Sequence, residues 1–380
     1  MARNSAARAL AAIALACSCL AAPARAADEI VLGNIASLSN PFSRTNVTNL
    51  LLGYNVYLEQ INRQGGVHGR RVKIVNKDDG IVPEKMMELT EELAADPSVL
   101  ALVGYLNTPG MQQLIKQGTL VKKKIALIAP VGSMNAQNFY PLRAGYDDEI
   151  EKLLEEAVST QKKRVALVYF NQTFGPGLFK FAEQAAKRVG ANVVATGGFE
   201  TAPDKIEKSV AETVERVSKA DPDAVVVMSS GPGVYAFTKK FRQTPSKYAQ
   251  IYTMSTSDAS SFVKVAGIEN ASGVVISQAV PYPEHNALAV VREYHKAMKE
   301  QAADQPLTFY GLEGFMGAKI AVEALRRAGP NPTRQKIIAA LNTMKDYDVG
   351  GFIVSYSATE RVGRKTVDLT IIGKNGVLYR

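Results

Sequence analysis

From Ile30 onward, short runs rich in β-branched and apolar residues alternate with longer amphipathic runs. This alternation predicts parallel β-sheets flanked by helices, because a helix usually makes the crossover between two parallel strands. We expect strands at residues 30–35, 72–76, 100–103, 125–129, 165–170, 193–199, 224–228, 251–254 and 274–276. We expect helices at residues 48–63, 83–94, 109–121, 147–160, 174–189, 205–220 and 234–241. The predicted fold class is α/β, with doubly wound parallel sheets.

The pattern changes after about Val280. Three helices are predicted in succession, at residues 286–302, 308–328 and 333–344, and β-like segments follow them to the C-terminus. The 380 residues are enough for two or three domains, yet no Gly-, Ser- or Pro-rich linker divides the chain. Two lobes are therefore plausible, but no simple tandem boundary is visible.

The first residues have the pattern of a secretory signal peptide, predicted over 1–26. A basic start precedes an apolar run and a small-residue exit, Ala24-Arg25-Ala26. The only cysteines, Cys17 and Cys19, lie in this segment, so a mature chain would have no thiol chemistry. Lipid anchoring at Cys17 is the less favoured reading, because Ala14 stands where a branched apolar residue is usual. The predicted location is the periplasm.

The charge pattern does not favour a nucleic-acid partner. The formal net charge is +9, and removing the three arginines of the leader leaves 42 basic against 36 acidic residues, a net charge of +6. The basic runs that remain are short and scattered along the chain. Solvated helix faces explain them better than a phosphate-binding surface.

A search for catalytic motifs finds little. The three histidines show no metal-binding spacing, and neither a Gly-x-Ser-x-Gly elbow nor a Walker or dinucleotide glycine pattern is present. The acid pairs Asp78-Asp79 and Asp147-Asp148 fall after a strand or at a helix start, where caps and helix-dipole partners explain them. We therefore predict no enzyme activity, no cofactor and no metal.

Several segments together resemble one known family. They are Ile30-Val31-Leu32-Gly33-Asn34-Ile35, the Gly65-Gly66-Val67-His68-Gly69-Arg70 segment with Asp78-Asp79 downstream, Leu102-Val103-Gly104-Tyr105 and Ile128-Ala129-Pro130-Val131-Gly132-Ser133. On these residues the chain resembles the exported solute-binding proteins of ABC transporters in the branched-chain amino acid (leucine/isoleucine/valine-binding) class. The Gly-Gly-x-x-Gly-Arg segment is the most specific of the four.

The resemblance implies two α/β lobes joined by a three-crossover hinge, the type I periplasmic binding fold. It places the crossovers near 146–148, 278–281 and 365–367. Lobe one would then hold residues 28–147 and 280–364, and lobe two residues 148–279 and 365–380. Lobes that are discontinuous in sequence would explain the missing linker.

The resemblance also implies the ligand-binding residues. A hydroxyl that holds a ligand carboxylate is expected at Thr108, which is also the expected N-cap of the following helix, and Asn107 stands beside it. The Val131 backbone and the Ser133 hydroxyl are expected at the ligand head group. The remaining expected positions are aromatic: Phe174 closing from lobe two, with Tyr105 and Tyr146 as neighbours in lobe one.

Departures from the family pattern affect the expected ligand, and one is Pro109, where the family often has serine, because proline removes one N–H donor. Members that bind amino acids have a glutamate for the α-ammonium, but Ser255 and Thr256 stand at the matching place, and Asp258 is the nearest substitute. The first loop is also longer, and its Arg44 is a candidate partner for a ligand carboxylate.

The sequence therefore favours a binding protein over an enzyme. We expect a monomer that traps a small carboxylate-bearing solute and delivers it to the permease subunits of an ABC importer. A branched-chain or other apolar amino acid is the default ligand. The alternatives are an amine-free aromatic or aliphatic acid in the same trap, or a ligand-sensing subunit for a membrane signalling partner.

Overall fold

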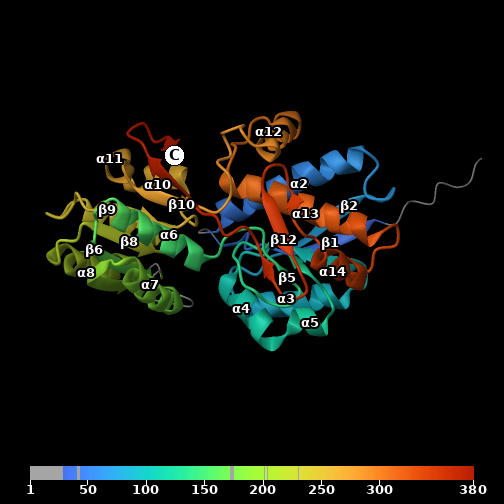
Figure 1. The fold of residues 1–380 in the computed structure, drawn as a ribbon, viewed down its shortest axis with the longest axis horizontal. Coiled ribbons are helices and arrows are strands. Elements are labelled where there is room, and N and C mark those ends of the chain that lie inside the picture. The colour runs from blue at the N-terminus through green and yellow to red at the C-terminus, as the bar shows by residue number, and fades with distance from the viewer. Residues whose placement is uncertain (1–28, 41–42, 172–174, 201, 203, 230) are drawn as a thin grey trace, which may run out of the picture.

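A computed structural model describes residues 29–40, 43–171, 175–200, 202, 204–229 and 231–380. Two bodies lie side by side in Figure 1, each built around its own sheet. We call them the five-stranded unit and the seven-stranded unit. The predicted α/β class with two parallel-sheet lobes is confirmed.

The five-stranded unit has a fully parallel sheet in the order β2-β1-β3-β4-β5. Its strands are β1 (Ile30–Ile35), β2 (Val72–Lys77), β3 (Val99–Val103), β4 (Leu127–Ile128) and β5 (Phe139–Tyr140). Its helices are α2 (Arg44–Arg63), α3 (Pro83–Ala95), α4 (Thr108–Gln117), α5 (Thr119–Lys122), α12 (Ala289–Gln301), α13 (Phe309–Ala328) and α14 (Arg334–Asn342). A small antiparallel sheet, β11 (Tyr347–Asp348), β12 (Ile353–Tyr356) and β13 (Arg361–Val362), completes it.

The seven-stranded unit has its sheet in the order β15-β14-β10-β9-β8-β6-β7. Its strands are β6 (Arg164–Phe170), β7 (Asn192–Phe199), β8 (Ala224–Met228), β9 (Gln250–Thr253), β10 (Val275–Gln278), β14 (Asp368–Ile372) and β15 (Leu378–Tyr379). Its helices are α6 (Tyr146–Ser159), α7 (Gly175–Val189), α8 (Ile206–Lys219), α9 (Pro232–Phe241), α10 (Ala259–Ala266) and α11 (Ile268–Ala271). Strands β7, β6, β8, β9 and β10 are parallel to one another, and β14 and β15 add an antiparallel edge.

The side chains of each central strand divide between two apolar cores. In β1, Ile30 and Leu32 pack with α2 and α13, whereas Val31 packs with α3 and α4 on the other face. In β6, Val168 packs with α8 and α9, whereas Leu167 packs with α6 and α7. This period of two, with both faces buried, is typical of strands covered by helices on both sides.

Glycines bring α2 and α13 into close contact. A Cβ atom added at Gly53 would lie 1.8 Å from the Gly311 carbonyl oxygen, and one at Gly314 would lie 2.0 Å from that of Leu50. Only glycine permits the two backbones to approach so closely. The packing fixes α13 over the sheet, and the first turns of α13 reach the boundary between the units.

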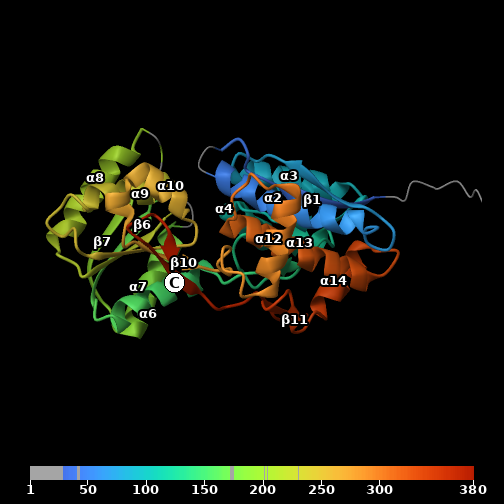
Figure 2. The ribbon, with the colours of Figure 1, turned by 90° about the horizontal axis from the view of Figure 1, so that it is seen from above.

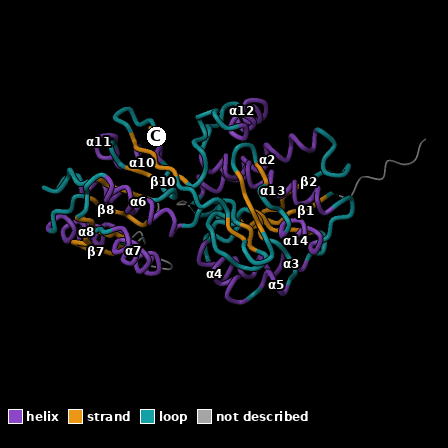
Figure 3. Tube along the Cα trace, viewed as in Figure 1, coloured by secondary structure: helices purple, strands orange, loops and turns teal. Residues whose placement is uncertain are grey.

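The chain passes between the two units three times. It leaves β5 for α6, returns from β10 to α12, and leaves β13 for β14. The connecting residues are irregular and appear as teal tube in Figure 3, and Figure 2 shows the same segments joining the bodies from above. The carboxyl ends of the parallel strands, where ligand sites of α/β sheets form, are next to this boundary.

The structure corrects some predicted elements. The helix expected at 109–121 is two helices, because Gly118 adopts φ 66° and ends α4 before α5 begins. The strand expected at 125–129 is only Leu127–Ile128. Helices α10 and α11 were not predicted, whereas the small sheet lies where β-like segments were expected after the last helix.

Candidate ligand-binding site

A cavity of about 440 Å³ lies at the boundary and is lined by both units. The five-stranded unit contributes Thr108 and Ser133, and the seven-stranded unit contributes Leu178 and Phe181 from α7. Tyr146, at the start of α6, lies between them. We call it the first cavity. It unites three of the residues expected at the ligand site.

Helix α4 begins at the wall of this cavity. Its N-cap is Asn107, whose Oδ1 accepts the Gly110 amide at 3.1 Å, so the expectation that Thr108 is the cap was wrong by one residue. The Asn107 Nδ2 donates to Asp79 Oδ2 at 2.8 Å, and the side chain is 2% exposed, so Asn107 supports the loop and offers no free group to a ligand. Thr108 lines the cavity instead. The first turn of α4 has no acidic residue, so its positive dipole end remains available to an anion.

The segment after β4 forms another part of the wall. The Val131 amide donates to the Tyr105 carbonyl at 2.7 Å, so the expectation that it binds the ligand head group was wrong for this N–H. Ser133, two residues further on, is partly exposed and lines the cavity. The contact of Ser133 with a ligand head group stays a prediction.

The two expected tyrosines differ in position. Tyr105 is fully buried in the core under α3 and α4, where its hydroxyl lies 3.4 Å from Thr90 Oγ1, so it belongs to the core and gives no surface to the cavity. Tyr146 is partly exposed and lines the cavity. Burial raises the pKa of the Tyr146 phenol, and the Arg143 charge and a hydrogen bond with Thr108 oppose that shift. Tyr146 thus faces the first cavity and also lies within range of the Arg143 charge.

Phe174, the aromatic expected to close over the ligand, lies outside the described residues. Helix α7 of the seven-stranded unit contributes Gly177, Leu178 and Phe181 to the first cavity. Like α4, α7 has no acidic residue in its first turn. The apolar contribution of this unit to the first cavity therefore comes from helix α7.

A second cavity of about 500 Å³ lies along the same boundary. Asp258 lines it as the N-cap of α10, and its Oδ2 accepts the Ser261 amide at 2.7 Å and the Ser260 hydroxyl at 2.6 Å. Arg44 is exposed, and its Nε donates to the Leu38 carbonyl at 2.9 Å. The structure does not place Arg44 or Asp258 on the first cavity; Asp258 faces the second one.

A buried ion cluster forms the floor between the cavities. Arg143 Nη2 donates to Glu149 Oε1 at 2.6 Å, and Arg143 Nη1 donates to Glu313 Oε2 at 3.2 Å. The three side chains are 2%, 0% and 3% exposed. Ser255 and Ser277 complete the set, which we call the floor cluster.

Sequence reasoning did not find the floor cluster. One signal was present: Glu149 and Glu313 each stand on a helix face that is otherwise apolar, next to Ile150 and Leu312. Such a position predicts a buried acid, and a buried acid needs a cation partner. Arg143 lies six residues from Glu149, within reach of local reasoning, but its contact with Glu313 spans 170 residues and could not be predicted.

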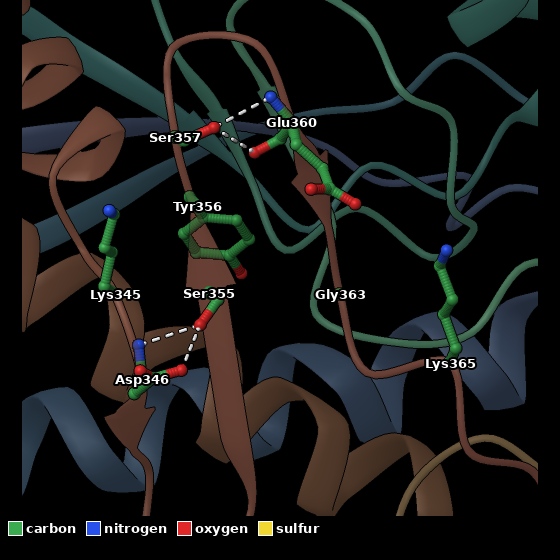
Figure 4. Close-up of a pocket in the computed structure, with 8 residues that line it drawn as sticks. All are labelled: Lys345, Asp346, Ser355, Tyr356, Ser357, Glu360, Gly363 and Lys365. Carbon is green, nitrogen blue, oxygen red and sulfur yellow. Dashed lines mark hydrogen bonds between the residues drawn. The ribbon is translucent and has the colours of Figure 1, made fainter.

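A further cavity of about 430 Å³ lies against the small sheet. Figure 4 shows its residues, which all lie between Lys345 and Lys365 in the sequence. Asp346 is bonded to the Ser355 hydroxyl, and Ser357 to the Glu360 backbone. Because one segment of one unit supplies the whole lining, this cavity does not bring the two units to a common ligand.

The described residues bear on two further possibilities, a metal-binding cluster and a membrane-spanning helix. Among the described residues, no group of three or more His, Cys, Asp and Glu side chains gathers as a metal site requires. Within the same part of the chain, none of the helices is long and apolar enough to cross a bilayer.

The two-unit fold with a cavity at the boundary is the architecture of a binding protein that encloses a solute. Residues 29–373 match the model of the periplasmic binding protein family, and the chain belongs to that family. The resemblance inferred from the sequence motifs is confirmed.

The chain is similar to several known proteins. It is 27% identical over 224 residues to BasB, the substrate-binding protein of a chemotactic signal transduction system in Halobacterium salinarum; the match covers 55% of this chain and about half of BasB, 51%. It is 24% identical over 281 residues to the Leu/Ile/Val-binding protein of Escherichia coli, covering 72% and 74% of the two chains. The solved extracellular ligand-binding receptor of Verminephrobacter eiseniae superposes with a TM-score of 0.84 at 26% identity, covering 93% and 100%.

Proposed function

We propose that the protein is a periplasmic receptor that traps a small carboxylate-bearing solute between its two units and delivers it to an ABC permease. The observation that carries this proposal is the first cavity. It combines the hydroxyls of Thr108 and Ser133 with an α4 N-terminus whose first turn has no acid. The positive dipole end of α4 favours an anion there, while Asp147 and Asp148, which line the α6 side of the same cavity, oppose one.

The two-unit arrangement supports a trap without chemistry. A ligand that contacts both walls of the first cavity binds the closed form more tightly than the open one, and so shifts the population toward closure. We keep the lobes as 28–147 with 280–364 and 148–279 with 365–380, and we place the hinge at the three segments between them. The periplasmic location and the leader at 1–26 belong to the same proposal.

The ligand class within the carboxylates is tested by matched pairs. Protein refolded free of ligand is titrated with L-leucine and with 4-methylpentanoate, which share a carbon skeleton and differ in the α-ammonium. L-Phenylalanine and 3-phenylpropanoate make the aromatic pair. Thermal shift and calorimetry then report binding. Stabilisation by amino acids supports the amino-acid receptor, stabilisation by amine-free acids alone replaces it with the amine-free receptor, and no binding in either pair contradicts the carboxylate proposal.

A sensing role is the second candidate, and the similarity to BasB favours it. BasB is by its name a substrate-binding protein of a chemotactic signal transduction system. The same trap would then present its closed surface to a signalling membrane protein instead of a permease. Crosslinking in membranes with the bound ligand present separates the two roles, because capture of permease subunits supports import and capture of a signalling protein supports sensing.

A further inference from the structure

The floor cluster joins elements that are far apart in the chain. Arg143 follows β5 in the five-stranded unit, and Glu313 lies on α13 of the same unit. Glu149 lies on α6, and Ser255 follows β9, both in the seven-stranded unit. A single guanidinium therefore contacts both units at the point where the chain first crosses between them.

The contacts on the seven-stranded side are complete. Glu149 Oε1 accepts Arg143 Nη2 at 2.6 Å and Ser255 Oγ at 2.9 Å, and Oε2 accepts the Ser255 amide at 2.9 Å and Ser277 Oγ at 2.6 Å. Arg143 Nη2 also donates to Ser255 Oγ. A carboxylate with four donors, one of them a charged guanidinium, is a strongly held group.

The contacts on the five-stranded side are incomplete. Arg143 and Glu313 share one bond of 3.2 Å. Within the described structure, Glu313 Oε1 and Arg143 Nε are buried without a hydrogen-bond partner. Arg143 is therefore held more tightly by the opposite unit than by the unit from which its own backbone comes.

The cluster also contacts the walls of both cavities. The Arg143 guanidinium carbon lies 6.0 Å from the centre of the Tyr146 ring, and Tyr146 lines the first cavity. Ser255 lines the second cavity, and its hydroxyl is hydrogen-bonded to both Arg143 and Glu149. Arg143 itself lines neither cavity, so any effect on a ligand passes through these two side chains.

We infer that Arg143 is a positioning residue of the ligand site, which holds Tyr146 and Ser255 in place at the boundary of the two units. The expected effect of Arg143 on ligand binding rests on the proposed function. The expected effect of Arg143 on the positions of Tyr146 and Ser255 does not.

The guanidinium geometry explains why arginine is required. A planar fork bonds two carboxylates in fixed directions while its face meets an aromatic ring, and an ammonium group has neither the fork nor the face. Arg143→Lys keeps the positive charge that Glu149 and Glu313 need and removes the geometry. It therefore separates charge compensation from positioning.

A matched control is available within the same protein. Arg334 also uses a forked guanidinium, bonding the carbonyls of Ala94, Asp96 and Val99 at 2.6–2.8 Å, and it lines neither boundary cavity. Arg334→Lys makes the same chemical change at a place where only the fold depends on it.

Hydrogen–deuterium exchange of the ligand-free protein tests positioning directly. With Arg143→Lys we expect the segments 144–149 and 253–257 to exchange at least ten-fold faster than in the wild type, and with Arg334→Lys we expect no change in them. Equal exchange of these segments in Arg143→Lys and the wild type overturns the inference. This measurement stands even if no tested carboxylate binds, a result that would contradict the proposed function alone.

Affinity provides the second readout. For whichever of L-leucine, 4-methylpentanoate, L-phenylalanine and 3-phenylpropanoate binds the wild type, we expect Arg143→Lys to weaken the Kd at least ten-fold and Arg334→Lys to leave it within two-fold. Affinity that falls equally in both variants would make Arg143 a stability residue only. If Arg143→Lys does not fold, Glu149→Gln loosens the same bonds with a neutral isostere, and the same pair of measurements decides.

Discussion

The loops that meet at the boundary are built differently in the two units. In the five-stranded unit one buried carboxylate braces three loops: Asp79 accepts the Ser37 hydroxyl at 2.5 Å, the Ile81 amide at 2.9 Å and the Asn107 amide group at 2.8 Å. These residues follow β1, β2 and β3. A braced edge offers a preformed surface, since its polar groups need no reordering when a ligand arrives.

In the seven-stranded unit, buried Glu149 holds Ser255 after β9 and Ser277 on β10. The described residues of the loops after β6 and β8 have no such buried carboxylate. Helices α7 and α9 start in Gly-Pro-Gly segments, and Gly231 adopts φ 58°. The Ser229 hydroxyl at the end of β8 is buried without a hydrogen-bond partner in the described structure. We propose from this difference that the five-stranded unit presents a preformed ligand surface and that the loops after β6 and β8 keep the backbone freedom that closure requires.

The largest expected effect comes from removing the brace. Asp79 is 1% exposed, so Asp79→Ala leaves the buried donors of Ser37 and Asn107, and the partly buried Ile81 amide, without their acceptor. We expect the free energy of unfolding, from urea denaturation, to fall by about 3 kcal/mol or more, at roughly 1–3 kcal/mol for each unsatisfied group.

The neighbouring acid is the control for this prediction. Asp78 is more exposed and accepts the Ser39 amide at 3.1 Å and the Gly80 amide at 3.0 Å. Asp78→Ala should cost about 1 kcal/mol or less, because water replaces an exposed acceptor. Equal losses in the two variants would show that the five-stranded side is not braced by Asp79 in particular.

The regular part of the fold could be predicted from the sequence because its signals are local. Strand β1 was expected with the bounds that it has, and α13 within one residue of them. The break at Gly118 and the cap at Asn107 were not predicted. A glycine within a helical pattern can continue the helix or end it, and either Asn107 or Thr108 could cap α4, so the choice depends on backbone angles that the sequence does not give.

The candidate site could be predicted only in part. Thr108, Ser133 and Tyr146 follow strands or begin helices at the carboxyl edge, and the structure gathers them on one cavity. Apart from the Arg143–Glu149 pair, six residues apart, the floor cluster depends on contacts between residues 106 to 170 positions apart, which no local pattern encodes. The boundaries of the two lobes stay a prediction.

The second expected effect concerns the incomplete side of the floor cluster. Burial raises the pKa of the Glu313 carboxyl above its ordinary value of 4.5, repulsion from Glu149 adds to this, and the Arg143 charge opposes it. Tyr54 and Tyr310 also face this group and stay neutral over the relevant range, because burial raises the pKa of each phenol.

The sign of the pH dependence follows from the raised pKa. The native carboxyl holds its proton more tightly than the unfolded chain does, so this contribution to stability is full below the unfolded value and is lost as pH rises through the folded pKa. Glu313→Gln has no such loss. We expect the melting temperature of Glu313→Gln relative to the wild type to be higher at pH 7.5 than at pH 4, and a difference that does not change with pH would contradict the prediction.

The third expected effect isolates the ligand surface of the braced unit. Ser133→Ala and Thr108→Val remove one hydroxyl each from the first cavity and leave the Asp79 brace intact. We expect each to weaken the Kd for the bound carboxylate about ten-fold, the effect of roughly one hydrogen bond to a charged group. The melting temperature of the ligand-free protein should stay nearly unchanged. A large loss of stability with Thr108→Val would instead assign that hydroxyl to support of the fold through Tyr146.

The smallest expected effect tests the loop after β8 in the seven-stranded unit. Ser229→Ala removes a buried hydroxyl that bonds no described residue, so no partner is left unsatisfied. We expect the free energy of unfolding to change by less than about 0.5 kcal/mol, or to rise, because an unpaired buried hydroxyl is itself a cost. A loss as large as that of Asp79→Ala would mean that Ser229 braces the seven-stranded side as Asp79 braces the other, and the contrast between the two units would fail. A neutral result, with hydrogen exchange faster in the loops after β6 and β8 than in those after β1 and β3, would place the adaptable wall of the ligand site in the seven-stranded unit.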